Sequence, residues 1–262
     1  MAFYDEYPKY VPVGEKKKKA EKAVERLKKK NPGIAPVMIT RRTIARTWWG
    51  KSWNNNLESY SDYSNRIERG RSYVRHGAVL DLQITPGKIS ALVQGSASKP
   101  YKAEITITPL SKATWEAVVQ ECAGKIDSLQ ELVTGKFPKG LSELFTAKGK
   151  GLFPAPKEIV FSCSCPDSAR MCKHVAAVLY GVGARLDEDS ALFFVLRSVN
   201  VDDLISVSLT QKSQAMLEKS SRGRGRRMMA DSDISNVFGI EVDMGETGES
   251  KGGSEKKTRR KQ

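Results

Sequence analysis

The chain has 262 residues, 39% of them hydrophobic, which is enough for one or two modest hydrophobic cores. The formal net charge of +14 favours a polyanionic partner such as nucleic acid, unless the excess charge is incidental and only keeps the chain soluble. No apolar run approaches the roughly 20 residues that span a bilayer, so no membrane partner is expected. The lack of a recognisable signal peptide favours a reducing, cytoplasmic compartment.

The first 33 residues form a strongly basic, flexible arm in our interpretation. A thin apolar stripe of alanine, valine and leucine runs between its lysines at helical spacing. This pattern predicts a marginal helix that becomes ordered on a phosphate backbone, or a solvated arm without specific contacts. The stripe consists of Ala20, Ala23, Val24 and Leu27.

A compact α+β domain is predicted over residues 34–150. Residues 37–39 favour a short strand, and the apolar spacing of Trp49, Trp53 and Leu57 predicts a helix. Tryptophan rings at this spacing either stack on single-stranded bases or belong to the core, and we favour the core. An arginine-rich stretch follows at residues 66–75. We expect it either to line a nucleic-acid surface or to cover the exposed side of a loop.

Residues 78–108 change to a β pattern. Three alternating apolar segments separated by turns predict an antiparallel meander. Helices are expected at residues 112–123, 126–134 and 141–147, with Cys122 on a buried face of the first. His76, which stands among arginines, is interpreted as a surface residue.

Cysteine and histidine are concentrated in residues 162–174. Two pairs, Cys163-x-Cys165 and Cys172-x-His174, are separated by six residues. Three soft thiolates and one imidazole at this spacing predict a tetrahedral zinc site. An apolar period that begins at Val175 places the second pair near a helix N-terminus, and residues 158–161 favour a strand before the first pair.

Four protein ligands leave no open position on the metal, so one structural Zn²⁺ is expected and not a catalytic one. The neighbouring Arg170 and Lys173 are placed to offset the negative charge of the centre, and they are also candidate nucleic-acid contacts. The alternatives are buried thiols or disulfides. Cysteines one residue apart are poorly placed to bridge each other, and the expected compartment is reducing.

Short helices that pack on the zinc-binding segment are expected over residues 187–218, followed by a disordered tail at 219–262. The arginines of the tail are candidate nucleic-acid contacts, namely Arg222, Arg224, Arg226 and Arg227. An apolar island at residues 231–244 either docks on a protein partner or folds back onto its own domain. Its proposed docking residues are Ile234, Val237, Phe238 and Ile240.

The motif at residues 163–174, with the Val/Ala-rich segment after it, resembles the SWIM-type zinc finger. The segment Trp48-Trp49-Gly50-Lys51-Ser52-Trp53 also resembles stand-alone bacterial SWIM proteins, which are often encoded beside Swi/Snf-type helicase-like ATPases. The zinc-finger motif itself covers about residues 158–185, and the resemblance implies zinc binding and an interaction role with DNA or protein. A helicase-like ATPase as partner follows from this resemblance alone.

The predicted fold is α+β, with an antiparallel β-meander and helices followed by the finger at residues 151–186. The predicted function is a non-catalytic accessory protein that binds nucleic acid, with DNA favoured, and no small-molecule substrate. The alternative is a protein–protein adaptor with incidental charge. Residues 45–52 fit a relaxed phosphate-loop pattern, but Trp48 and Trp49 are too bulky for that loop.

Overall fold

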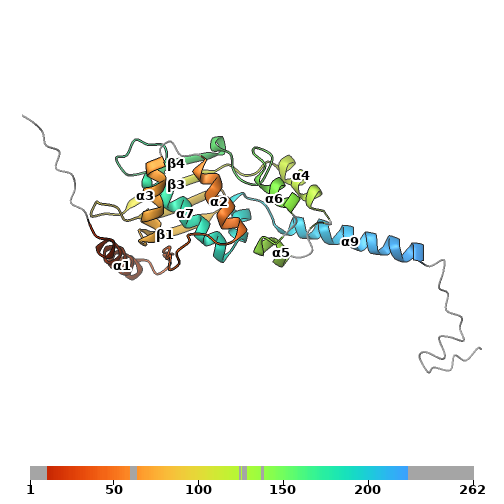
Figure 1. The fold of residues 1–262 in the computed structure, drawn as a ribbon, viewed down its shortest axis with the longest axis horizontal. Helices are drawn as coiled ribbons and strands as arrows, with labels where there is room; N and C mark the ends of the chain where they lie inside the picture. The colour runs from red at the N-terminus through yellow and green to blue at the C-terminus, as the bar shows by residue number, and fades with distance from the viewer. Residues whose placement is uncertain (1–10, 60–63, 124, 126–128, 137–138, 224–262) are drawn as a thin grey trace, which may run out of the picture. The chain divides into compact units, whose positions relative to one another are not determined.

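The computed structural model describes residues 11–59, 64–123, 125, 129–136 and 139–223. The chain divides into two compact units, residues 1–214 and 215–262. The helices and strands (Figure 1) are α1 (Val13–Lys30), α2 (Trp48–Glu58), α3 (Ser64–Arg75), β1 (Val79–Thr85), β2 (Lys88–Val93), β3 (Tyr101–Ile107), α4 (Lys112–Cys122), α5 (Leu129–Thr134), α6 (Lys139–Thr146), β4 (Ile159–Cys163), α7 (Lys173–Glu188), α8 (Ala191–Leu196) and α9 (Asp202–Gly223).

The sheet confirms the predicted antiparallel meander and adds a strand to it. Its order is β1-β2-β3-β4, and every neighbouring pair is antiparallel. The added strand is the one expected to begin the finger, because Phe161 of β4 lies opposite Ile105 of β3. The zinc-finger segment is therefore built directly onto the edge of the sheet.

Helix α7 is the centre of the hydrophobic core. It lies between the sheet and the pair of helices α2 and α3 (Figure 1), and it contacts all four strands as well as both helices. Twelve of its sixteen residues are buried. A helix that is apolar on all sides is stable only inside a core, which explains its composition of valine, alanine, leucine and glycine.

Close approach of helices is possible here because the contact residues are small. A Cβ atom at Gly50 of α2 would lie 2.5 Å from the carbonyl oxygen of Gly183 in α7. At Gly70 of α3 it would lie 2.5 Å from Cβ of Ala176. Glycine and alanine at these crossings let both helices pack directly against the α7 backbone.

The tryptophans of α2 are core residues, as favoured from the sequence. Trp49 and Trp53 are 0% and 1% exposed, and their indole N–H groups donate to the carbonyl oxygens of Leu132 and Leu179, both at 2.8 Å. Thr47 caps the helix through its hydroxyl, which accepts from the N–H of Gly50. Neither buried ring is accessible to a nucleic-acid base.

Asp187, near the end of α7, binds the loop that precedes α2, a contact that the sequence did not indicate. Its carboxylate accepts from the backbone N–H of Arg46 at 2.7 Å and from the N–H and hydroxyl of Thr47 at 2.9 and 2.7 Å. Arg41 lies 3.5 Å away, and the Asp187 side chain is 2% exposed. A buried charge with several donors holds the loop before α2 onto α7.

Several predicted elements have different bounds. Residues 37–39 are not a strand, although the backbone N–H of Val37 donates to the carbonyl of Val79, the first residue of β1. The arginine-rich stretch at residues 66–75 is the helix α3 and not a loop. The basic arm contains the eighteen-residue helix α1, of which only Ala20 is fully buried. The helix expected at 126–134 is described from Leu129 onward, because residues 126–128 lie outside the described chain.

Candidate metal centre

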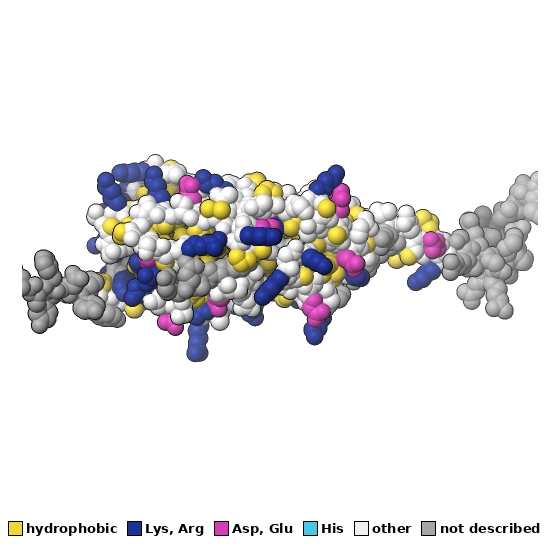
Figure 2. Space-filling view, turned by 90° about the horizontal axis from the view of Figure 1, so that it is seen from above, with side chains coloured by type: hydrophobic (Ala, Val, Ile, Leu, Met, Phe, Trp, Pro, Cys, Tyr) yellow, Lys and Arg dark blue, Asp and Glu magenta, His cyan; other side chains and the backbone are white. Residues whose placement is uncertain are grey.

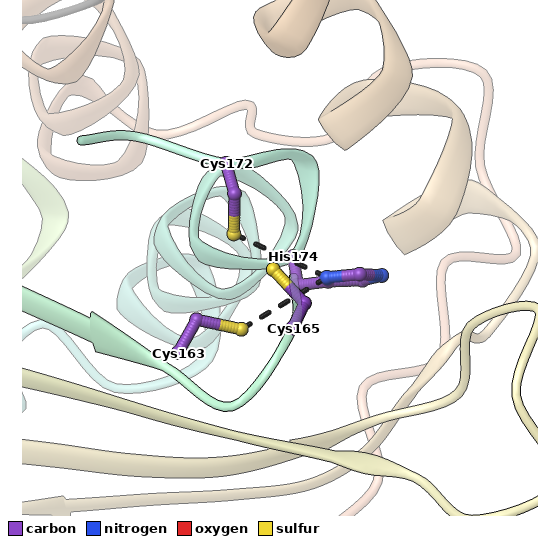
Figure 3. Close-up of side chains that lie close together, drawn as sticks. All are labelled: Cys163, Cys165, Cys172 and His174. Atoms are coloured by element: carbon purple, nitrogen blue, oxygen red, sulfur yellow. Dashed lines mark hydrogen bonds between the residues drawn. The ribbon is translucent and has the colours of Figure 1, made fainter. Parts of the chain in front are cut away.

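The four predicted ligands come together at one place. Cys163, Cys165, Cys172 and His174 each offer one ligand atom, and these atoms all lie within 4.8 Å of one another. Nδ1 of His174 is 3.9 Å from Sγ of Cys163 and 4.0 Å from Sγ of Cys172. Figure 3 shows the three sulfurs and the imidazole pointing toward a common centre.

Two elements deliver these ligands. The first pair lies at the end of β4 and in the loop after it, and the second pair lies at the start of α7 (Figure 3). Cys172 is the N-cap residue of α7, as the helical period after Val175 predicted. The order strand, loop and helix N-terminus therefore brings residues eleven positions apart into contact.

The helix N-terminus favours a thiolate at Cys172. The N–H of Val175 donates to its Sγ at 3.5 Å. Hydrogen bonding from Cys163, followed by bonds with His174 and the Val175 N–H, lowers the pKa of the Cys172 thiol although burial opposes this. A deprotonated sulfur is the form that binds metal, so this position at the helix N-terminus suits Cys172 as a ligand.

The loop between the two pairs is tied to α3. Arg66 forms a salt bridge with Asp167 at 3.0 Å, and the N–H of Ala169 donates to the same carboxylate at 3.2 Å. Burial opposes ionisation of Asp167, but the Ala169 N–H and the Arg66 guanidinium outweigh it and lower its pKa. Asp167 and Arg66 are therefore supporting residues of the site, which the sequence analysis did not identify.

The His174 ring is enclosed by aromatic groups. It is 1% exposed, with the Tyr101 ring centroid 4.5 Å away and the Tyr73 centroid 5.4 Å away. A Cβ atom at Gly95 would lie 2.9 Å from its Nε2 atom and 2.5 Å from the Tyr101 ring. Glycine is thus the residue that fits behind this imidazole, and the ring is closely packed on these sides.

This donor set fits a zinc ion. A tetrahedron with Zn–S bonds of about 2.3 Å and a Zn–N bond of about 2.0 Å has edges of about 3.5–3.8 Å, a little shorter than the sulfur–nitrogen distances of 3.9 and 4.0 Å here. The cysteines of the described chain are thiols without disulfide bonds, and the imidazole presents Nδ1 to two of them. Three sulfurs and one nitrogen complete the coordination, so the ion is structural.

Comparison with known proteins agrees with this geometry. Residues 162–182 match the family model described as SWIM zinc finger, so the chain contains a SWIM-type zinc finger. A protein of Mycobacterium tuberculosis (strain ATCC 25618 / H37Rv), named Uncharacterized protein Rv2102, is 38% identical over 168 residues. That match covers 64% of this chain and 60% of the relative, less than two thirds of its length. No solved structure matches the chain.

Two of the proposed nucleic-acid contacts, Arg170 and Lys173, lie close in sequence to the ligand cluster. The Arg170 guanidinium donates to the carbonyl of Pro156 at 3.1 Å, so it holds the chain before β4. Lys173 is half-buried in the first turn of α7. Arg222 lies within the backbone of α9, while the tail arginines at 224, 226 and 227 and the docking segment at 231–244 lie outside the described residues.

The arginines of α3 divide into two groups. Arg66 pairs with Asp167, and Arg71 pairs with Glu58, which also accepts from the Tyr180 hydroxyl at 2.7 Å. Arg69 and Arg75 are exposed on the same helix. The first two arginines therefore stabilise contacts between elements, and the last two contribute positive charge to the surface.

Proposed function

We propose that this protein binds nucleic acid, with DNA favoured, through a surface that its zinc-organised core presents. The observation that carries the proposal is the charge of α1, which has nine lysines and arginines against three glutamates. All nine of these basic side chains are exposed. Lysine and arginine side chains also project from several other places on the face shown in Figure 2. Such charge binds phosphates with little dependence on base sequence.

A salt series tests this proposal. Labelled single- and double-stranded DNA is titrated with the purified full chain at increasing salt. Contact with about four phosphates of a single strand gives a slope near −2.8 in log affinity against log salt, or roughly 50-fold weaker binding between 50 and 200 mM. Binding without salt dependence, or no binding at low salt, would instead favour a protein–protein adaptor whose charge is incidental.

Docking on a helicase-like ATPase is a second proposal, and it rests on the SWIM resemblance. Zinc fingers of this family are domains without catalytic activity, which is consistent with an accessory role. The segment at residues 231–244 is the proposed contact. Deleting it and comparing capture of the candidate ATPase with that of the full chain decides whether this segment takes part.

No helix in the described ranges has both the length and the hydrophobicity needed to cross a membrane.

A further inference from the structure

A pocket lies between α1, α3 and the chain that follows β2. Its volume is about 270 Å³. Lys16, Lys19 and Ala20 of α1 form one side, Tyr73 of α3 and His76 just after that helix form another, and Gly95 and Ser96 close it. This volume is slightly below the ~300–1,000 Å³ range of small-molecule sites, so an occupant of the pocket is no larger than one nucleotide.

The charged side chains that line this pocket are all positive. Two lysines line it, and the described residues that line it include no carboxylate. A neighbouring hollow of about 330 Å³ also touches His76, but Glu21 and Glu25 line that hollow together with Lys17 and Arg75. An anionic group is therefore attracted to the first pocket more than to the second.

The pKa of His76 is consistent with a positive potential in this pocket. Burial lowers the pKa of its imidazole, and the charges of Lys16, Lys17 and Arg75 lower it further. The side chain stays neutral at neutral pH and can donate or accept a hydrogen bond, as its 3.5 Å contact with the Ser72 hydroxyl indicates. The cations around it are the groups that attract a phosphate.

Part of the pocket wall is apolar and buried. Ala20 and Ala78 are buried, and the Tyr73 ring is half-buried against His174. At the rim, the Lys19 ammonium contacts the carbonyl oxygens of Gly95 and Ser96 at 3.4 and 3.5 Å. An aromatic ring beside a cationic rim is the combination that binds an unstacked base and its phosphate.

We propose that this pocket binds one unpaired nucleotide of a single-stranded nucleic acid, which deepens the proposed function and rests on it. Lys16 and Lys19 contact the phosphate, and the base packs against Tyr73. A base in an intact duplex is paired and stacked, so it does not enter such a pocket. The pocket thus gives the protein a preference for single strands that surface charge alone does not provide.

The zinc centre supports the wall of this pocket. Tyr73 and Gly95 both line the pocket and both lie against the ring of His174, which a bound zinc ion would hold in place. Release of the ion frees this ring and removes the fixed backing of both residues. Zinc therefore acts on nucleotide binding through packing, although the ligands themselves are not in contact with the strand.

Two double variants with the same loss of charge test the pocket. Lys16→Ala with Lys19→Ala removes the pocket lysines, while Lys18→Ala with Lys22→Ala removes exposed lysines of α1 that line neither hollow. The probe is a fluorescein-labelled oligothymidylate of about twelve nucleotides, within the ~4–16 nucleotide range of single-strand sites. A blunt duplex of equal length is measured in parallel, and thermal melting checks that both variants fold.

Loss of two phosphate contacts is expected to make the slope of log affinity against log salt shallower by about 1.4 in the pocket variant. This change corresponds to a roughly 25-fold weaker affinity at 0.1 M salt. The control variant, which loses only exposed charge of α1, is expected to lose less of the slope than the pocket variant, and the wild type binds the single strand more tightly than the duplex. Equal losses of affinity in the two variants, or equal affinity of the wild type for the single strand and the duplex, would overturn the proposal of a nucleotide pocket. The proposed binding of nucleic acid would remain. Failure of the wild-type chain to bind either probe at low salt would remove the proposed function and this inference together.

Discussion

Replacing Cys172 with serine is expected to abolish zinc binding and to unfold the chain well below the melting temperature of the wild type. A serine hydroxyl does not ionise near neutral pH, so it cannot replace the thiolate. Cys172 is 2% exposed and caps α7, the helix at the centre of the core. Structural zinc contributes about 10–16 kcal/mol in isolated fingers, which equals or exceeds the ~5–15 kcal/mol stability of a typical domain.

Cys122→Ser is the matched control for this variant. Cys122 is also buried, and burial raises the pKa of its thiol to about 12, but it lies in α4 and outside the ligand cluster. This variant is expected to keep one zinc per chain and to lose stability only through the buried hydroxyl. Metal analysis and thermal melting distinguish the two cases. Stoichiometric zinc in Cys172→Ser would show that the ligand assignment is wrong.

Trp53→Ala is expected to lower the free energy of unfolding by about 3–5 kcal/mol, the range for deleting a large buried aromatic side chain. The Trp53 ring is 1% exposed and packs between α7 and Phe193, and its indole N–H donates to the carbonyl of Leu179. Chemical denaturation monitored by circular dichroism measures the loss.

Trp53→Phe separates the two contributions of this residue. It keeps an aromatic ring in the core but removes the donor to Leu179, so a smaller loss of about 1–3 kcal/mol is expected. If Trp53 were instead a base-stacking residue, the alanine variant would keep its stability and lose affinity for single-stranded DNA. That result would contradict the packing of α2 against α7.

The metal site could be predicted from the sequence because its signal is local. Both ligand pairs, the strand before them and the helix after them lie within one short segment, and cysteine and histidine have few other reasons to cluster there. The same holds for the three strands of the meander and for the buried faces of α2 and α4, whose apolar periods are regular.

The long-range contacts could not be predicted in this way. Nothing local indicates that β4 pairs with β3, or that Asp187 binds the loop before α2 across about 140 positions of sequence. The arginines of α3 obscured its helical period, since only Ile67, Gly70 and Val74 are buried. The partnership of Arg66 with Asp167 depends on this helix and was missed for the same reason.

The finger is consequently part of the core and not an appended module. Its strand completes the sheet, its helix fills the interior, and its histidine supports two aromatic rings. Loss of the metal is therefore expected to affect the packing of α2, α3 and the sheet together.

The most direct test of this account is the zinc content of the full chain, purified without added metal and measured together with protein concentration. One zinc ion per chain is expected, and removing the ion with a chelator is expected to move the thermal transition well below the melting temperature of the zinc-bound chain. A chain that contains no zinc, or that melts at the same temperature with and without it, would contradict the central role assigned to Cys163, Cys165, Cys172 and His174.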